Sequence, residues 1–357
     1  MGKSPRKANS RVFELRKVRV SLTNNKLPAE NELRHALSFW ERIFRRRRPD
    51  KIITGSPERC LCRTVIEDVE GNLLLLEEIA PATRDHKQSI ITTLHFLHRQ
   101  GLKKINPCME TRGGETIIHS SGRLWQLSRF IEGIPLKRPS YVRSAVRGRA
   151  LAKFLLELDR CARGIDTVRD TTVFSLRLFI EDLMDKLRHH RPEIHARVLP
   201  TLNFIREGAL DIHDRFPVRF CHGDYHPLNV IWSRRDIRAV IDWEFCGFKP
   251  EWYDAANLIG CIGMEDPKGL AGPLVLELIS CLKGTQYLSD QSWNSLLGAV
   301  IALRFAWLSE WLRGRDEAMI ELEITYMALI QKYAGKIEDV WNRETGSARP
   351  SLPIKQS

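Results

Sequence analysis

The chain has 357 residues, of which 43% are hydrophobic and 28% charged, a composition typical of a soluble globular protein with a sizeable core. This length favours two domains or lobes. No apolar stretch is long enough to span a membrane, and the basic N-terminus lacks the apolar region of a secretory signal. The eight cysteines are scattered, and Cys60-x-Cys62 matches neither a zinc knuckle nor a redox C-x-x-C motif. We therefore expect a cytoplasmic protein with reduced thiols.

The net charge of +12 is partly local. Residues 1–20 hold seven Lys and Arg against one Glu, and residues 45–48 are a run of four Arg. Basic segments can bind nucleic acid or anionic lipid, but they are more often solvated faces. Because no helix-turn-helix or aromatic-interleaved pattern accompanies them, we do not expect nucleic acid to be a partner. Residues 1–30 are predicted to form a basic, flexible tail.

The first part of the chain predicts a small antiparallel sheet accompanied by helices. A helix is predicted over residues 31–47, with Leu33, Leu37, Trp40 and Ile43 at helical spacing. Strands over 63–69 and 73–79 follow, joined by a turn at Glu70-Gly71-Asn72. A helix over 87–100, stopped by Gly101, and short strands over 117–118 and 124–131 complete this part. The remainder of the chain reads as mostly helical. Its predicted helices are 142–158, 176–187 before Pro192, one that starts near 252–258, and three near 270–283, 291–313 and 316–340.

The densest group of polar side chains interrupts these helices. An apolar run over residues 218–221 predicts a strand that leads into a loop. Residues 229–232 and 237–241 then predict a β-hairpin, which ends beside Asp242 and Glu244. Such a hairpin can gather side chains from the loop and from the strand end around one small volume.

The spacing of these side chains matches the requirements of phosphoryl transfer. His222, Asp224 and Asn229 form an H-x-D-x-x-x-x-N pattern, the spacing of a kinase catalytic loop, and Asp242 follows after the hairpin. The reaction needs an acceptor for the substrate hydroxyl proton and oxygen ligands that hold Mg²⁺ against nucleotide phosphates. The pattern therefore predicts Asp224 as the base, with Asn229 and Asp242 as metal ligands.

Two segments, HGDYHPLN and VIDWE, resemble the signature of the aminoglycoside phosphotransferase/choline kinase family of small-molecule kinases. The resemblance is sharp over residues 218–260 and extends over about 50 to 340. It implies an α+β, bilobal, protein-kinase-like fold that uses ATP and Mg²⁺. The small antiparallel-sheet N-lobe, which binds nucleotide, would span residues 31–133, and the larger, mostly helical catalytic and substrate-binding lobe 134–345. A flexible tail over 346–357 would follow.

The resemblance also implies roles for further residues. His222 would brace the catalytic loop, and Gly55 and Ser56 would begin the loop over the phosphates, although a plain turn explains this pair equally well. The backbone of residues 126–133, which include Gln126 and Ser128, would form the hinge that hydrogen-bonds adenine. Glu244 could support a second Mg²⁺ or its waters, or cap a turn, and Asp254 would brace the site.

The N-lobe departs from the family pattern after its third strand. Where relatives usually carry Lys or Arg, this chain has Glu77 and Glu78, and the next helix offers Lys87 where Glu is usual. Our hypothesis is a swapped ion pair, with Lys87 meeting Glu77 or Glu78 and directed toward the phosphates. Two alternatives are that these are surface charges, so that backbone and Mg²⁺ alone hold the nucleotide, or that the chain is a pseudokinase.

Other interpretations of the polar loop explain less. A hydrolase-type metal cluster of His222, Asp224 and His226 leaves Asn229 and Asp242 without a role. A solvated loop with local turn bonds fits a lone HGD better than the full pattern. A protein kinase would need a longer activation segment after Asp242. The sequence thus predicts a kinase that transfers the γ-phosphoryl group of ATP to a small-molecule hydroxyl, with a catalytically inactive nucleotide-binding scaffold as the alternative.

The acceptor is not specified by these motifs. Amino sugars, aminoglycosides, choline-like alcohols, homoserine and other sugars are all compatible with the resemblance, and the oligomeric state is open. Trp307 and Trp311 lie one helical turn apart with Glu310 between them, which could suit a cationic amine. A tryptophan pair at this spacing is more often core packing.

Overall fold

The computed structural model describes residues 28–55 and 59–344. Within these ranges the chain forms two compact units. Unit 1 consists of the described residues up to Leu136 together with Glu157–Phe174 and Phe220–Phe248, and unit 2 consists of the rest. The segment with the H-x-D-x-x-x-x-N pattern therefore belongs to the same compact unit as the N-terminal sheet. Ser56 lies outside the described residues, as do the predicted tails except for residues 28–30.

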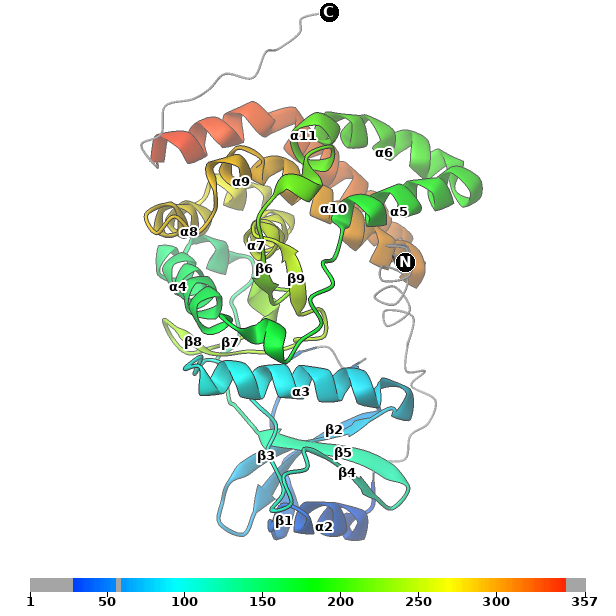
Figure 1. Ribbon diagram of the computed structural model, residues 1–357, viewed down its shortest axis with the longest axis vertical. Helices are drawn as coiled ribbons and strands as arrows, with labels where there is room; N and C mark the ends of the chain where they lie inside the picture. The colour runs from blue at the N-terminus through cyan, green and yellow to red at the C-terminus, as the bar shows by residue number, and fades with distance from the viewer. Residues whose placement is uncertain (1–27, 56–58, 345–357) are drawn as a thin grey trace, which may run out of the picture. The chain divides into compact units, whose positions relative to one another are not determined.

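Unit 1 is built on a five-stranded antiparallel sheet in the order β1-β2-β3-β5-β4 (Figure 1). The strands are β1 (Phe44–Arg47), β2 (Cys62–Asp68), β3 (Leu73–Ile79), β4 (Ile117–Ser120) and β5 (Arg123–Arg129). The predicted hairpin over residues 63–79 is confirmed as β2–β3, and the two short strands predicted over 117–118 and 124–131 pair as β4 and β5. Their turns contain Gly71 and Gly122 at φ 83° and 76°, a conformation that glycine adopts without steric cost.

Alternate residues of β3 face the two sides of this sheet. Leu74 and Leu76 pack into a core with helix α2 (Glu30–Ser38) on one side, whereas Leu75 and Glu77 line a pocket on the other. Helix α3 (Arg84–Arg99) contributes Ile90, Ile91 and Leu94 to that pocket. The strand alternation therefore separates the apolar core from the face that lines the pocket.

The helix predicted over residues 31–47 is too long, since α2 ends at Ser38. The chain turns at Glu41, whose φ is 55°, and continues as edge strand β1, where Arg45 and Arg46 pair with Glu67 of β2. Ile43, assigned to the apolar helix stripe, is 63% exposed. The arginine run is thus a strand held by a carboxylate across the sheet, a partner that helical spacing alone does not show.

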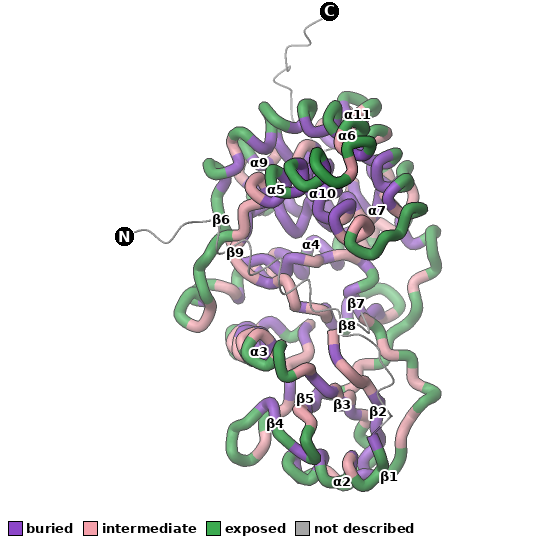
Figure 2. The backbone as a smooth tube through the Cα atoms, turned by 90° about the vertical axis from the view of Figure 1, so that its right-hand side faces the viewer, coloured by how far each residue is buried: buried purple, intermediate pink, exposed green. Residues whose placement is uncertain are grey.

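Unit 2 is mostly helical, and buried positions follow α7 and α10 (Figure 2). Its helices are α5 (Leu176–His190), α6 (Pro192–Ile205), α7 (Tyr253–Glu265), α8 (Pro273–Lys283), α9 (Asp290–Asn294), α10 (Leu296–Gly314) and α11 (Glu317–Glu344), and α4 (Ala145–Cys161) has residues in both units. The single helix predicted over 291–313 is two helices, separated at Ser295. None of the described helices is long and apolar enough to cross a membrane.

Four short strands complete the fold: β6 (Val218–Cys221), β7 (Val230–Trp232), β8 (Ile237–Val240) and β9 (Gly247–Pro250). The predicted strand over 218–221 is β6, and the predicted hairpin is confirmed as the antiparallel pair β7–β8. Strand β9, which the sequence did not predict, pairs with β6. The hairpin and the loop that precedes it, residues 222–229, both belong to unit 1.

Candidate active site

His222 connects the predicted catalytic loop, residues 222–229, to the segment that carries Asp242. The ring is fully buried, its Nδ1 accepts a hydrogen bond from the Asp224 backbone N–H at 3.2 Å, and its Nε2–H donates to the carbonyl of Ile241 at 3.0 Å. Trp243 packs against the ring at 4.5 Å between centroids. Because backbone groups use both ring nitrogens, His222 is a positioning residue.

Asp224 is held by neighbours on its own loop. The Asn229 side-chain amide donates to the backbone oxygen and to Oδ2 of Asp224, at 3.0 and 3.1 Å. His226 Nδ1 accepts from the Leu228 N–H, which directs Nε2–H toward Asp224 Oδ1 at 3.6 Å. Burial raises the pKa of Asp224, but His226, His222 and Arg59 outweigh burial and hold this pKa at about 2. Asp224 is therefore a carboxylate at neutral pH.

Asp242 follows β8 in a left-handed conformation, with φ 64°. This backbone conformation is costly for any residue other than glycine, and such strain tends to occur at functional sites. The side chain is 5% exposed, and Oδ1 is buried without an aligned hydrogen bond among the described residues, although Arg59 Nε lies 3.3 Å away as an ion pair. Burial, with the charges of Asp224 and Glu244, raises the pKa of Asp242. A cation would relieve this buried oxygen.

The donor set fits Mg²⁺. The side-chain nitrogen of Asn229 faces Asp224, so its side-chain oxygen, Oδ1, can serve as one metal ligand. The buried Oδ1 of Asp242 is a second. No group of three or more His, Cys, Asp and Glu among the described residues could hold a metal. Mg²⁺ usually binds one or two protein oxygens and completes its shell with waters and substrate phosphates. The cluster of His222, Asp224 and His226 is not a metal site, since both nitrogens of His222 are already hydrogen-bonded.

The Lys87 ion pair differs from the predicted swap. Lys87, on α3, pairs with Glu244, whereas Glu78 pairs with Arg123 at 2.8 Å and the side chain of Glu77 accepts from Gln126 at 2.8 Å. Glu78 lies on the opposite face of β3 from Glu77, so it does not line the pocket. The charge of Glu77 still helps Glu244 to raise the pKa of Lys87 against the effect of burial.

Glu244, assigned from sequence to a second metal or a turn cap, is engaged by two side chains of α3. Oε1 meets Lys87, and Oε2 lies 3.3 Å from His86 Nε2, which also lies 3.1 Å from the Glu244 carbonyl. Burial raises the pKa of Glu244, but Lys87 and His86 hold it at about 2. The pair therefore ties α3 to the segment that follows Asp242.

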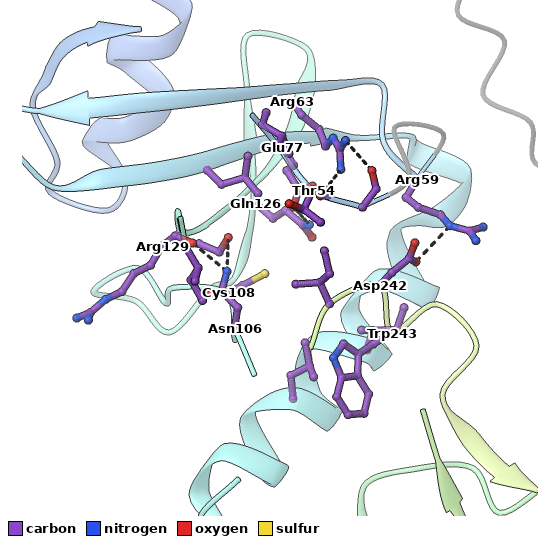
Figure 3. Close-up of a pocket in the computed structure, with 18 of the residues that line it drawn as sticks. Thr54, Arg59, Arg63, Glu77, Asn106, Cys108, Gln126, Arg129, Asp242 and Trp243 are labelled. Atoms are coloured by element: carbon purple, nitrogen blue, oxygen red, sulfur yellow. Dashed lines mark hydrogen bonds and ion pairs between the residues drawn. The ribbon is translucent and has the colours of Figure 1, made fainter. Parts of the chain in front are cut away.

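A pocket between the sheet, α3 and the β7–β8 hairpin adjoins these groups (Figure 3). Gly55 lines it at φ 93°, and a Cβ there would approach Ile241 Cδ1 to 3.1 Å. Gln126 and Ser128 also line it, but they lie within β5 and pair with β3, so their backbone is not a hinge. Among the described residues, none hydrogen-bonds to the backbone of Ile131, which follows β5 and lines the same pocket.

Some residues singled out from sequence belong to unit 2, and one residue of the site was not predicted. Asp254 is buried in the first turn of α7, in unit 2. The indole N–H groups of Trp307 and Trp311 donate to Asn257 and Glu323 inside unit 2, which accounts for the pair as packing. Arg59, beside Asp242, was not predicted; its place four residues after Gly55 is the only signal that the sequence offers.

The model of the Phosphotransferase enzyme family matches residues 70–291, which is more than half of the chain. The chain belongs to this family. A homoserine kinase from Rhodopseudomonas palustris (strain TIE-1) is 24% identical over 243 residues, covering 67% of this chain and 72% of the relative. Residues 70–291, which the family model matches, include Lys87, the predicted catalytic loop and Asp242, whereas Gly55 and Arg59 lie before them.

Solved structures share the protein-kinase-like fold of this phosphotransferase. An aminoglycoside phosphotransferase from Alicyclobacillus acidocaldarius superposes with a TM-score of 0.59 at 14% identity, covering 91% of this chain and 98% of the other. The amicoumacin kinase hAmiN, in complex with AMP-PNP, Ca²⁺ and Ami, superposes with a TM-score of 0.60 at 13% identity, covering 88% and 94%. The predicted α+β fold, with an antiparallel sheet and a mostly helical remainder, is confirmed.

Proposed function

We propose that this family member transfers the γ-phosphoryl group of ATP to a hydroxyl group of a small molecule, with Mg²⁺ as cofactor. The observation that carries the proposal is the hydrogen-bonded link through His222, which joins the Asp224 backbone to the residue before Asp242. A proton acceptor and a metal-binding carboxylate are thereby fixed relative to each other. Phosphoryl transfer depends mainly on such positioning and on electrostatic stabilisation.

Asp224 is the proposed base. Its carboxylate would accept a hydrogen bond from the acceptor hydroxyl and take the proton as the oxygen bonds to the γ-phosphorus. The bond from that phosphorus to the bridging oxygen of ADP breaks in the same displacement. A pKa of about 2 makes Asp224 a weak base, which suits a late proton transfer. Asn229 orients the carboxylate through its amide.

Asn229 and Asp242 are the proposed metal ligands, through the side-chain oxygen Oδ1 of Asn229 and the buried Oδ1 of Asp242. When bound, Mg²⁺ would neutralise charge on the nucleotide phosphates. The apolar side chains of the pocket would cover the adenine ring of the nucleotide. The backbone of Ile131 would offer this ring one hydrogen-bond donor and one acceptor. Gly55 would admit the phosphates close to the backbone.

The proposed acceptor is a hydroxylated small molecule of the types named from sequence, which are amino sugars, aminoglycosides, choline-like alcohols, homoserine and other sugars. Two observations support this range. The matched relative is a homoserine kinase, and the matched structures include aminoglycoside and amicoumacin kinases. Homoserine is the first acceptor to assay, since it comes from a relative identified by sequence.

The second candidate is a catalytically inactive nucleotide-binding scaffold. It is favoured by Glu77, which occupies the pocket position on β3 where a cation is usual, and by Arg59, which pairs with Asp242. A phosphotransferase and a scaffold differ in turnover, so one paired measurement separates them.

The test is calorimetry of ATP with Mg²⁺, run beside an ADP-release screen over homoserine, amino sugars, aminoglycosides and hydroxylated amines. The kinase proposal expects binding and acceptor-dependent ADP release. In Asp224→Ala, binding should persist and turnover should fall by about 10²-fold or more, the usual effect of losing a general base. Binding without turnover on any acceptor would favour the scaffold. Normal turnover in Asp224→Ala would contradict the assigned base.

A further inference from the structure

The pocket lacks a cation at the β3 position that faces it. Glu77 occupies this position, and its carboxylate accepts a hydrogen bond from the Gln126 side chain at 2.8 Å. A nucleoside triphosphate carries several negative charges, which proteins usually meet with Arg or Lys as well as Mg²⁺. If the proposed function holds, another side chain must supply this positive charge.

Four cationic residues are among the described residues that line the pocket: Arg59, Arg63, Lys87 and Arg129. Lys87 is buried against Glu244. Arg63 donates to the carbonyls of the loop before it, at Thr54 and Gly55. Arg129 extends away from Asp242 (Figure 3). Three of the four are therefore committed to other groups or directed elsewhere.

Arg59 is placed differently, at the edge of the proposed metal site. Its Nε lies 3.3 Å from Asp242 Oδ1 (Figure 3). Its guanidinium carbon lies 4.9 Å from the centre of the Phe245 ring. The side chain is 31% exposed, although its Nε is buried beside Asp242. The contact with Asp242 is not an aligned hydrogen bond, which makes it easier to exchange for another anion.

We propose that Arg59 binds the phosphates of the nucleotide in this chain, exchanging Asp242 for phosphate oxygens when Mg²⁺ binds to that carboxylate. The inference rests on the proposed function. Guanidinium groups bind phosphate oxygens through paired N–H donors, so one arginine can replace a missing lysine. In the absence of metal and nucleotide, Arg59 balances the buried charge of Asp242. Arg59 lies before residues 70–291, the part of the chain that the family model matches.

The first experiment compares ligands that differ in phosphate content. ATP, ADP and adenosine are titrated by calorimetry, in Mg²⁺, into wild type, Arg59→Ala, Arg59→Lys and the control Arg45→Ala. Arg45 is an exposed arginine paired with Glu67 away from the pocket. In Arg59→Ala the Kd for ATP should rise about tenfold or more, as expected for one lost charge-assisted hydrogen bond. The Kd for adenosine should stay within about twofold, Arg59→Lys should recover part of the loss, and Arg45→Ala should match wild type.

The second experiment tests the exchange with Asp242 in Mg²⁺-free buffer. Asp242→Asn removes the competing charge, so Arg59→Ala should weaken ATP binding more in the Asp242→Asn background than in wild type. Equal losses in the two backgrounds would overturn the exchange. An unchanged ATP affinity in Arg59→Ala, or equal losses for ATP and adenosine, would overturn the phosphate contact itself. If wild type binds no ATP, the proposed function fails and the inference fails with it; melting temperatures of all variants verify folding.

Discussion

His222 donates a hydrogen bond through Nε2–H to the carbonyl oxygen of Ile241 at 3.0 Å. Nδ1 of the same ring accepts the backbone N–H of Asp224. One buried imidazole therefore spans from the loop that carries the proposed base to the strand end that carries the proposed metal ligand. Because Asp242 has a strained, left-handed backbone, it depends on this kind of anchoring.

Replacing His222 with Ala should uncouple the two carboxylates. The change leaves two buried backbone groups unpaired, each of which costs about 1–3 kcal/mol, so we expect a lower melting temperature as well as reduced turnover. The Mg²⁺ concentration that gives half-maximal ATP binding should rise, because Asp242 is less well positioned. His189→Ala is the control, since that histidine is exposed on α5. Unchanged turnover in folded His222→Ala would show that the link is dispensable.

The ion pair between Lys87 and Glu244 should be a stability element. Lys87→Met leaves the carboxylate of Glu244, whose side chain is only 13% exposed, without its main partner, which should cost about 3 kcal/mol of unfolding free energy. The double variant Lys87→Met/Glu244→Gln should recover much of this loss, because no unpaired charge remains. Urea unfolding measures both. Equal destabilisation in the single and double variants would contradict the pairing.

The same pair predicts how stability responds to acid. The pKa of Glu244 in the folded protein is about 2, below its ordinary 4.5, so its charged form stabilises the fold fully above pH 4.5. That contribution is lost as pH falls from 4.5 toward 2. Melting temperature measured over this range should therefore fall less steeply in Glu244→Gln than in wild type. Parallel curves would mean that Glu244 does not carry this dependence.

Gly55 and Gly71 offer a matched pair of glycines. Both have positive φ, at 93° and 83°, so alanine at either position should cost about 1 kcal/mol of stability. Only at Gly55 would the added Cβ crowd the pocket, at 3.1 Å from Ile241, whereas nothing lies within 4 Å at Gly71. ATP binding should weaken in Gly55→Ala and remain at the wild-type level in Gly71→Ala. Similar affinities in both variants would remove Gly55 from the nucleotide site.

Unit 2 contains a buried ion pair with its own control on the same helix. Arg304 and Glu323 are at most 2% exposed and meet at 2.5 Å, so Glu323→Gln should cost about 3–5 kcal/mol of unfolding free energy. Glu321, on α11 as well, pairs with Arg197 while 57% exposed, and Glu321→Gln should change stability by about 0.5 kcal/mol or less. Thermal and urea unfolding of the two variants make the comparison. A similar effect from both would contradict the role of burial.

Much of the architecture was predictable from local pattern. The β2–β3 hairpin has a glycine turn between apolar strands, and β6 and the β7–β8 hairpin follow from short apolar runs separated by polar turns. The end of α2 was not predictable in this way. Trp40 and Ile43 continue a helical spacing, but Ile43 is exposed because the following arginines pair with Glu67 on another strand.

The proposed site also has features that the local sequence predicts and features that it does not. The sequence by itself determined the position of the proposed catalytic loop and the identity of its polar groups, since Asp224, Asn229 and the hairpin leading to Asp242 lie within one short stretch whose geometry is local. Only the tertiary structure decided the charge pairing. Lys87 lies 157 residues before Glu244, and Arg59 still further from Asp242. Electrostatic partners are chosen by distance in space and by burial, and neither is encoded in the spacing of residues along the chain.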